Sequence, residues 1–124
     1  MKDLTKAEEQ VMHALWKLEK AFVKDVMEEF PEPKPAYNTV STIIRILEKK
    51  EFVSYKAFGK THQYFPIVSK EDYTKHTAGQ LVDNYFDGSF KNLVSFFVKD
   101  NDMTVKEMDE LMKVIEAKKE QNRK

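Results

Sequence analysis

The sequence predicts a mostly α-helical protein with one small β-hairpin, made of an N-terminal part over residues 1–68 and a C-terminal helical part over residues 69–124. Apolar residues recur at helical spacing in several segments, which are separated by proline, glycine or aspartate. β-Branched and aromatic residues gather on either side of Gly59, which is typical of a hairpin. A length of 124 residues suits one domain, or one small domain with an added oligomerisation element.

Capping residues and apolar spacing indicate the first two helices. Thr5 is a predicted N-cap, and Glu8 stands three residues later, where its carboxylate can accept a hydrogen bond from the Thr5 backbone. The apolar residues at helical spacing are Leu4, Ala7, Val11, Ala14, Leu15 and Leu18. A shorter helix is predicted over residues 23–30. The segment 31–35 ends it, because its three prolines cannot continue a helix.

A third helix is predicted over about residues 36–50, and its two sides differ sharply. At about 100° per residue, one stripe of side chains is apolar, and the side chains on the opposite side are short and polar or basic. The apolar stripe holds Val40, Ile43, Ile44 and Leu47, and the opposite side holds Asn38, Ser41, Thr42, Arg45 and Lys49. Thr42 is β-branched, and a plain solvated helix would favour a better helix former at that position.

A hairpin follows, with strands expected over residues 53–58 and 61–66 around the turn Gly59-Lys60. Three helices followed by a hairpin are the element order of a winged helix-turn-helix. In that fold the third helix enters a DNA groove and the hairpin, called the wing, touches the DNA backbone. We therefore expect residues 1–68 to form a winged helix-turn-helix DNA-binding domain.

The charge distribution supports this interpretation. The chain has 21 basic and 21 acidic residues, so a generally basic, DNA-coating protein is excluded. Between residues 34 and 62, however, six basic residues stand against two acidic ones, a local charge of +4. This excess coincides with the third helix and the wing, where phosphates would be neutralised.

Side-chain chemistry then predicts two kinds of DNA contact. Arginine pairs with guanine and asparagine with adenine in the major groove, and threonine can contact a thymine methyl. The candidates for base contacts are Asn38, Ser41, Thr42 and Arg45. The candidates for backbone contacts, which set register without reading sequence, are Lys34, Tyr37, Thr39, Lys49, Lys56, Lys60 and His62.

Three further helices are expected over about residues 69–86, 89–99 and 104–118, with breaks at 87–89 and 100–102. Apolar residues occur on more than one side of the middle helix, more than a single packing face can use. We favour a homodimer interface, and a core shared with the winged domain of the same chain is the alternative. The predicted interface residues are Leu81, Tyr85, Phe86, Phe90, Leu93, Val94, Phe97, Met108, Leu111, Met112 and Ile115.

The composition also argues against other classes of protein. With no cysteine, the chain can have no disulfide, thiol nucleophile or cysteine-based copper sensor, and its three histidines lack metal-binding spacing. No nucleophile–base pair is visible, so we expect neither an enzyme nor a metal site nor a cofactor. No apolar run matches a membrane span or a signal peptide, so no membrane insertion and a cytoplasmic location are expected.

Four segments carry a resemblance to a known family: residues 4–12, 39–42, 47–50 and 59–66. In this order and spacing they resemble the penicillinase-repressor family (BlaI/MecI type) of bacterial winged helix-turn-helix transcriptional repressors. The resemblance implies a cytoplasmic homodimer that binds a palindromic DNA operator and represses antibiotic-resistance or cell-wall-stress genes. It also implies relief of repression when a membrane sensor-protease causes a cut in the dimerisation region.

The chain departs from the family pattern at three places. Arg45 stands one residue earlier than the family's usual arginine, so the operator sequence can differ. Glu51 occupies a position where many members have glycine. The cleavable Asn-Phe bond of the family aligns with Phe96-Phe97, so Phe96 stands where the family has asparagine, and this bond is the candidate regulatory cleavage site.

A second functional class fits part of the same pattern. A winged helix can act as a protein-interaction module without sequence-specific DNA binding, and the zero net charge and the apolar helices after the wing are compatible with that role. Neutralising the basic residues would leave binding undisturbed in that case.

Overall fold

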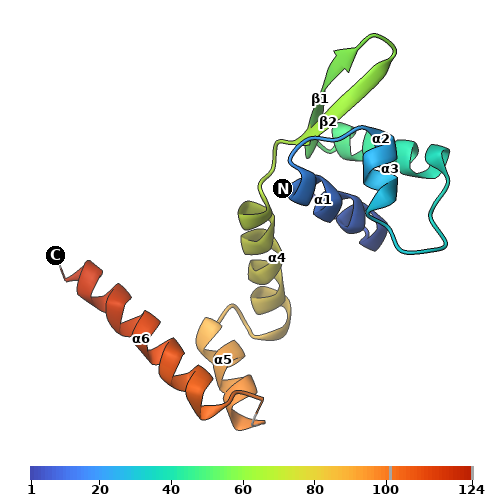
Figure 1. Ribbon diagram of the computed structural model, residues 1–124. Coiled ribbons are helices and arrows are strands. Elements are labelled where there is room, and N and C mark those ends of the chain that lie inside the picture. Colours follow the sequence, from blue (N-terminus) through green and yellow to red (C-terminus); the bar gives the residue numbers. More distant parts are fainter. Residues whose placement is uncertain (101, 124) are drawn as a thin grey trace. The chain divides into compact units, whose positions relative to one another are not determined.

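The computed structural model describes residues 1–100 and 102–123 and confirms the mostly helical fold with one hairpin. Asn101, which belongs to a predicted break between helices, lies outside the described residues. The chain forms two compact units, Met1–Thr77 and Ala78–Lys124. The first unit contains α1 (Lys6–Leu18), α2 (Val23–Glu28), α3 (Tyr37–Lys49), β1 (Val53–Phe58) and β2 (Thr61–Pro66), the order of a winged helix (Figure 1).

The predicted capping box starts α1. The Glu8 backbone N–H donates to Thr5 Oγ1 at 3.2 Å, and the Thr5 N–H donates to Glu8 Oε1 at 2.8 Å. These two bonds satisfy backbone donors that the first helical turn leaves without partners. The buried apolar face of α1 consists of Val11, Met12, Ala14 and Leu15.

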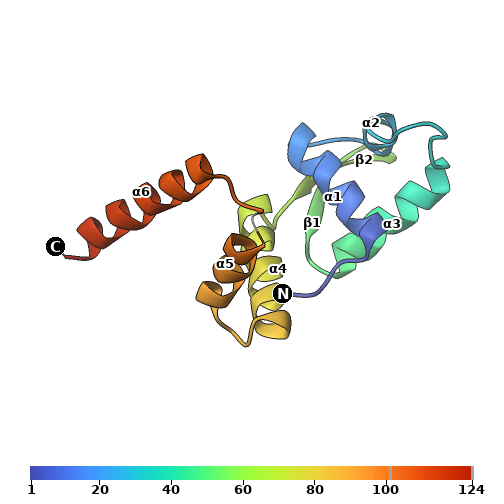
Figure 2. The same ribbon diagram turned by 90° about the horizontal axis from the view of Figure 1, so that it is seen from below.

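The core of the first unit lies between α1, α2, α3 and the base of the hairpin (Figure 2). Its largest fully buried side chains include Phe52, Met12, Leu15, Ile44 and Leu47. The helix predicted over 23–30 ends earlier, at Glu28. The N–H groups of Glu29 and Phe30 bond to carbonyls three residues back, so the chain tightens into a turn before the proline corner.

The hairpin has the predicted strands and a two-residue turn. β1 and β2 are antiparallel, with Tyr55 opposite Tyr64 and Phe58 opposite Thr61. Gly59 has a φ of +64°, a left-handed conformation that glycine adopts without strain. On the other edge of β2, Ala21 and Tyr64 exchange two backbone hydrogen bonds of 2.9 and 2.8 Å, which fix the wing to the end of α1.

Glu51 ends α3 in the role that glycine usually has. Its φ is +65°, its N–H donates to the Glu48 carbonyl, and the Phe52 N–H donates to the Leu47 carbonyl at 2.9 Å. This is a Schellman motif, and its hydrophobic contact comes from the buried side chains of Leu47 and Phe52. The glutamate therefore keeps the tight helix end, at the expense of a strained backbone.

We expect Glu51→Gly to raise the free energy of unfolding by about 1 kcal/mol, because glycine adopts the left-handed conformation without a Cβ clash. Urea unfolding measures this change. Glu48→Gly is the matched control within the same helix and should lower stability by about 1 kcal/mol. A loss of stability in both variants would contradict the strain at Glu51.

Helix α4 (Lys70–Tyr85) belongs to both units. Tyr73 is buried in the first unit, where its ring lies 5.7 Å from Phe52 and 6.0 Å from Trp16, and its hydroxyl donates to Glu9 Oε2 at 2.8 Å. Burial raises the pKa of this hydroxyl, and the bond to Glu9 raises it further. Because Tyr73 packs into its core, the first compact unit extends to Thr77. The sequence predicts a boundary after residue 68.

The second unit contains α5 (Phe90–Lys99) and α6 (Val105–Asn122). The Ser89 side chain caps α5, and Thr104 forms a capping box with Glu107 at the start of α6. The sequence predicts an end of α6 at residue 118, but the helix continues to Asn122. The residues added are lysine, glutamate, glutamine and asparagine, mostly good helix formers. Within the described residues, no helix has the length and apolar character that a membrane crossing requires.

Candidate nucleic-acid interface

The two sides of α3 are separated as the sequence predicts. Val40, Ile44 and Leu47 are buried, and Ile43 is half-buried against the same core. The opposite side carries predicted base-contact residues, and three of the four are exposed: Asn38, Thr42 and Arg45. Ser41, the fourth, is half-buried. Because the apolar stripe fixes the helix in the core, its polar side is held rigidly at the surface.

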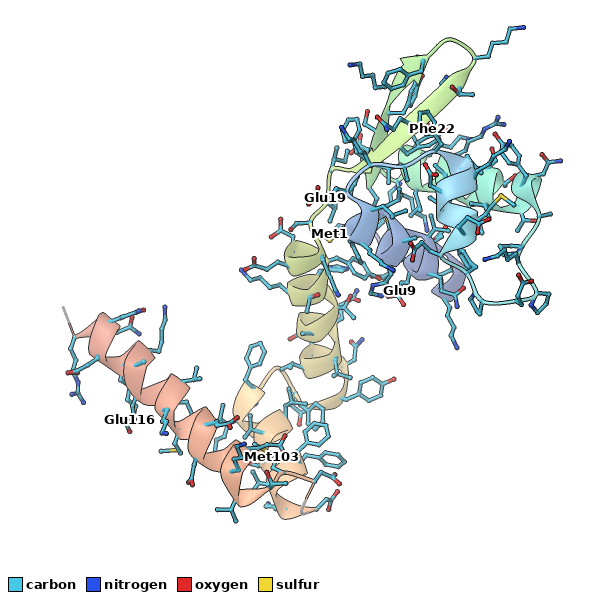
Figure 3. All side chains as sticks on the ribbon, in the orientation of Figure 1. Met1, Glu9, Glu19, Phe22, Met103 and Glu116 are labelled. Atoms are coloured by element: carbon cyan, nitrogen blue, oxygen red, sulfur yellow. The ribbon has the colours of Figure 1, made fainter. Side chains whose placement is uncertain are left out.

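A groove of about 440 Å³ lies between α3, the start of α2 and the wing. From α3 it is lined by Tyr37, Ser41 and Arg45, and from the wing by Lys60, Thr61, His62 and Tyr64. The start of α2 adds Phe22, Val23, Lys24 and Asp25. Phe22 lies beside the hairpin (Figure 3), and its ring packs edge-on against Phe58 at 5.9 Å. This contact links the start of α2 to the wing.

Aromatic side chains shape the wing where it faces α3. The rings of Tyr55 and His62 stack at 4.0 Å with an angle of 7° between their planes, and Tyr64 lies edge-on to His62 at 6.1 Å. Burial raises the pKa of the Tyr64 hydroxyl, and the nearby Glu48 carboxylate raises it further. The hydroxyl of Tyr64 therefore stays protonated at neutral pH, and the stack holds His62 at the groove.

Most of the predicted cations of this surface have no carboxylate partner. Within residues 1–100 and 102–123, no salt bridge involves Arg45, Lys49, Lys56 or Lys60. Among the described residues that line the groove, the one carboxylate is that of Asp25, which accepts a hydrogen bond from the Phe22 N–H at 2.9 Å. The groove therefore presents positive charge that a polyanion can neutralise.

Two lysines of the predicted +4 surface have partners inside the protein. Lys50 Nζ lies 2.7 Å from Glu8 Oε1, and it also donates to the Asp3 carbonyl at 3.1 Å. Lys34 Nζ donates to the carbonyls of Glu28 and Phe30 at 3.2 and 3.0 Å. Lys50 therefore balances a buried carboxylate, and the sequence count overstates the charge available to a ligand.

The groove brings together some of the predicted contact residues and not others. Tyr37, Ser41, Arg45, Lys60 and His62 line it. Lys49 lies with Arg45 and His62 in a neighbouring hollow. The residues that line neither hollow are Lys34, Asn38, Thr39, Thr42 and Lys56.

Sequence reasoning missed several polar residues of the groove, among them Lys24 and Thr61. Thr61 directly follows the turn residues that were singled out, so its place in the wing was a usable signal. Lys24 gave no such signal, because it reaches the groove only through the packing of α2 against α3 and the wing.

The second unit has an apolar hollow of about 490 Å³. Its lining is entirely apolar or aromatic: Leu81, Tyr85, Phe86, Leu93, Phe96 and Phe97. The rings of Phe86 and Phe96 lie 5.6 Å apart, and those of Phe96 and Phe97 lie 5.5 Å apart. Several apolar and aromatic side chains of this unit therefore remain exposed to water.

Of the eleven predicted dimer residues, five line this hollow: Leu81, Tyr85, Phe86, Leu93 and Phe97. Seven of the eleven are exposed: Leu81, Tyr85, Phe90, Val94, Phe97, Met112 and Ile115. Four are half-buried: Phe86, Leu93, Met108 and Leu111. Neither α5 nor α6 contains a buried residue.

No cluster that could hold a metal ion, meaning three or more histidine, aspartate, glutamate or cysteine residues, occurs in the part of the chain that the structure describes.

Comparisons of the sequence with known proteins match nearly the whole chain. The family model described as penicillinase repressor matches residues 4–117. The chain is similar to the methicillin resistance regulatory protein MecI of Staphylococcus aureus (strain N315), with 29% identity over 94% of this chain and 95% of that protein. It is also similar to the penicillinase repressor of Bacillus licheniformis, with 24% identity over 98% and 94% of the two chains. A solved CopR repressor structure matches 53% of this chain and 97% of that chain, with 31% identity and a TM-score of 0.45.

Proposed function

Because this chain belongs to the penicillinase-repressor family, we propose that it is a homodimeric, DNA-binding transcriptional repressor. In this proposal α3 and the wing bind a palindromic operator, and the α5–α6 region joins two copies. The protein then controls antibiotic-resistance or cell-wall-stress genes, and it acts in the cytoplasm, where a bacterial operator lies. No catalytic step is assigned to the chain.

The observation that carries the proposal is the cationic groove between α3 and the wing. It combines Arg45, Lys60 and Lys24 with the hydroxyl groups of Ser41 and Thr61. Cations and hydroxyl donors of this kind bind phosphate oxygens, and an exposed helix beside them can enter the major groove. Lys24 and Thr61 therefore join the backbone-contact residues.

A second copy of this chain is the proposed occupant of the apolar surface on the second unit. The hollow lined by Leu93 and Phe97 exposes almost only apolar side chains, and exposed apolar patches often mark interaction sites. Apolar residues of α6 also recur at the three- and four-residue spacing of a helix-pairing stripe: Val105, Met108, Met112 and Ile115. A two-fold dimer would place two copies of α3 on the two halves of a palindrome.

We further propose that induction acts on the dimer. A membrane sensor-protease would cause a cut at the Phe96–Phe97 bond, whose two side chains are exposed. The bond lies inside α5, so cutting requires this helix to open locally. Each copy would then hold the operator through its own DNA-binding domain alone, and it would dissociate from the DNA by mass action.

A gel shift against the promoter of the protein's own operon, repeated across salt concentrations, tests the DNA-binding function. We expect specific binding whose affinity falls steeply with salt, because phosphate contacts release counterions. Absence of specific binding, or affinity independent of salt, would overturn the proposal and favour a protein-interaction module.

Single substitutions should separate sequence reading from phosphate binding. Lys60→Ala should weaken all DNA sites by a similar factor and reduce the salt slope by about 1, because one phosphate contact is lost. Arg45→Ala should remove about 1–3 kcal/mol of discrimination at one base position. Binding curves on the operator and on scrambled DNA measure both effects. Equal behaviour of the two variants would contradict the assigned roles.

A further inference from the structure

The exposed surface of α3 has two sides of different chemistry. The side toward the wing carries hydrogen-bonding and charged groups, since Tyr37, Ser41 and Arg45 line the groove. The other side carries Thr39, Thr42 and Ile46, which line neither the groove nor the hollow beside it. At about 100° per residue, these three side chains fall within about 60° of one another around the helix. All three are β-branched and end in methyl groups.

Packing in the core does not explain why residue 46 is an isoleucine, because Ile46 is not among the side chains of the core. Its exposed fraction is 39%, and the buried face of α3 is made by Val40, Ile44 and Leu47. An exposed isoleucine lowers helix propensity and gains nothing from water. Thr42 lies one helical turn before it and is also exposed. A methyl-bearing patch on an otherwise polar surface is stabilised only when an apolar partner covers it.

The major groove of DNA offers one apolar partner, the C5-methyl group of thymine. A β-branched side chain holds its methyl groups in few rotamers, so it can meet a thymine methyl with little loss of side-chain entropy. We propose that Thr42 and Ile46 are specificity-determining residues that read thymine methyl groups, while the wing side of α3 supplies charge and hydrogen bonds. The inference rests on the proposed DNA-binding function.

Replacing operator thymines one at a time by deoxyuridine tests this directly, because uracil differs from thymine only by the missing methyl. With the full-length protein, we expect affinity to fall about fourfold for each methyl contacted, the effect of one buried methyl-sized group. In Ile46→Ala and Thr42→Ser the loss at the corresponding position should disappear. Thr42→Ser removes the methyl and keeps the hydroxyl. The matched control is Ile67→Ala, because Ile67 is 54% exposed and lies outside α3; it should keep the full deoxyuridine effect.

Thermal unfolding of the variants separates DNA reading from a structural role, and all three should unfold near the wild-type temperature. Specific binding by the wild type with no deoxyuridine effect would overturn this inference alone. So would an effect that Ile46→Ala and Thr42→Ser leave unchanged. Absence of any specific DNA binding would overturn it together with the proposed function.

Discussion

Replacing Leu93 and Phe97 together by aspartate is expected to turn the proposed dimer into monomers and to weaken operator binding by about 100-fold or more. Both side chains line the apolar hollow of the second unit, one helical turn apart on α5. Two buried carboxylates without partners would oppose association strongly. Each monomer would then bind a single half-site. It would lose the higher affinity that a dimer gains by binding both half-sites of one operator at once.

Sedimentation velocity and the gel shift measure the two parts of this prediction. The matched control is the double variant Lys91→Asp with Lys99→Asp. It changes the charge of α5 by more than the Leu93/Phe97 variant does, but at exposed positions that are already polar. It should remain dimeric. The first unit should stay folded in both variants, because its core contains no residue of α5. A Leu93/Phe97 variant that remains dimeric, or a monomer that binds the operator as tightly as the wild type, would contradict the prediction.

Glu8→Ala is expected to lower the free energy of unfolding by about 3 kcal/mol at neutral pH, the usual loss when one member of a buried ion pair is removed. The Glu8 side chain is 6% exposed and that of Lys50 is 23% exposed. Glu8 also completes the α1 capping box. The substitution therefore leaves the Lys50 ammonium partly buried without its carboxylate, and it removes the bond from the Thr5 N–H to the Glu8 carboxylate.

The same pair predicts a dependence on pH. Burial raises the pKa of the Glu8 carboxyl, but the bonds from Lys50 and Thr5 outweigh burial, and the net pKa lies below its ordinary value of 4.5. A lowered pKa in the folded state stabilises the protein above the unfolded-state pKa, and this stabilisation is lost as pH falls through the folded-state value. The difference between wild type and Glu8→Ala should therefore shrink below about pH 4.5.

Urea midpoints measured from neutral to acid pH test both statements. Glu71→Ala serves as the control, because it removes an exposed ion pair with Lys75 on α4 and should change stability little. A Glu8→Ala variant as stable as the wild type at neutral pH would show that the ion pair adds nothing.

Local patterns were sufficient for much of the fold. The Thr5–Glu8 capping box, the buried stripe of α3 and the Gly59 turn depend on residues close in sequence, and their hydrogen bonds or apolar spacing are readable there. The ends of α2 and α6 were less predictable. The α2 boundary depends on how the chain tightens before the prolines, and α6 ends in a run of good helix formers with no stop signal.

The candidate site was predictable only in part, because partners far apart in sequence define it. A count of charges placed Lys50 with the other basic residues, whereas its pairing with Glu8 depends on the packing of α1 against α3. Lys24 reached the groove because α2 packs beside the wing. Nothing near either lysine in the sequence distinguishes a structural cation from one that is available to bind.

By itself, the sequence determined the order of helices and hairpin, the polar face of α3 and the family, because spacing and capping act over a few residues and survive as readable patterns. Only the tertiary structure decided which cations remain available, which side of α3 faces the wing, and that Tyr73 joins α4 to the first unit. The physical reason is that burial and ion pairing arise between elements distant in the chain, so residues of the same type acquire different roles once packing chooses their neighbours.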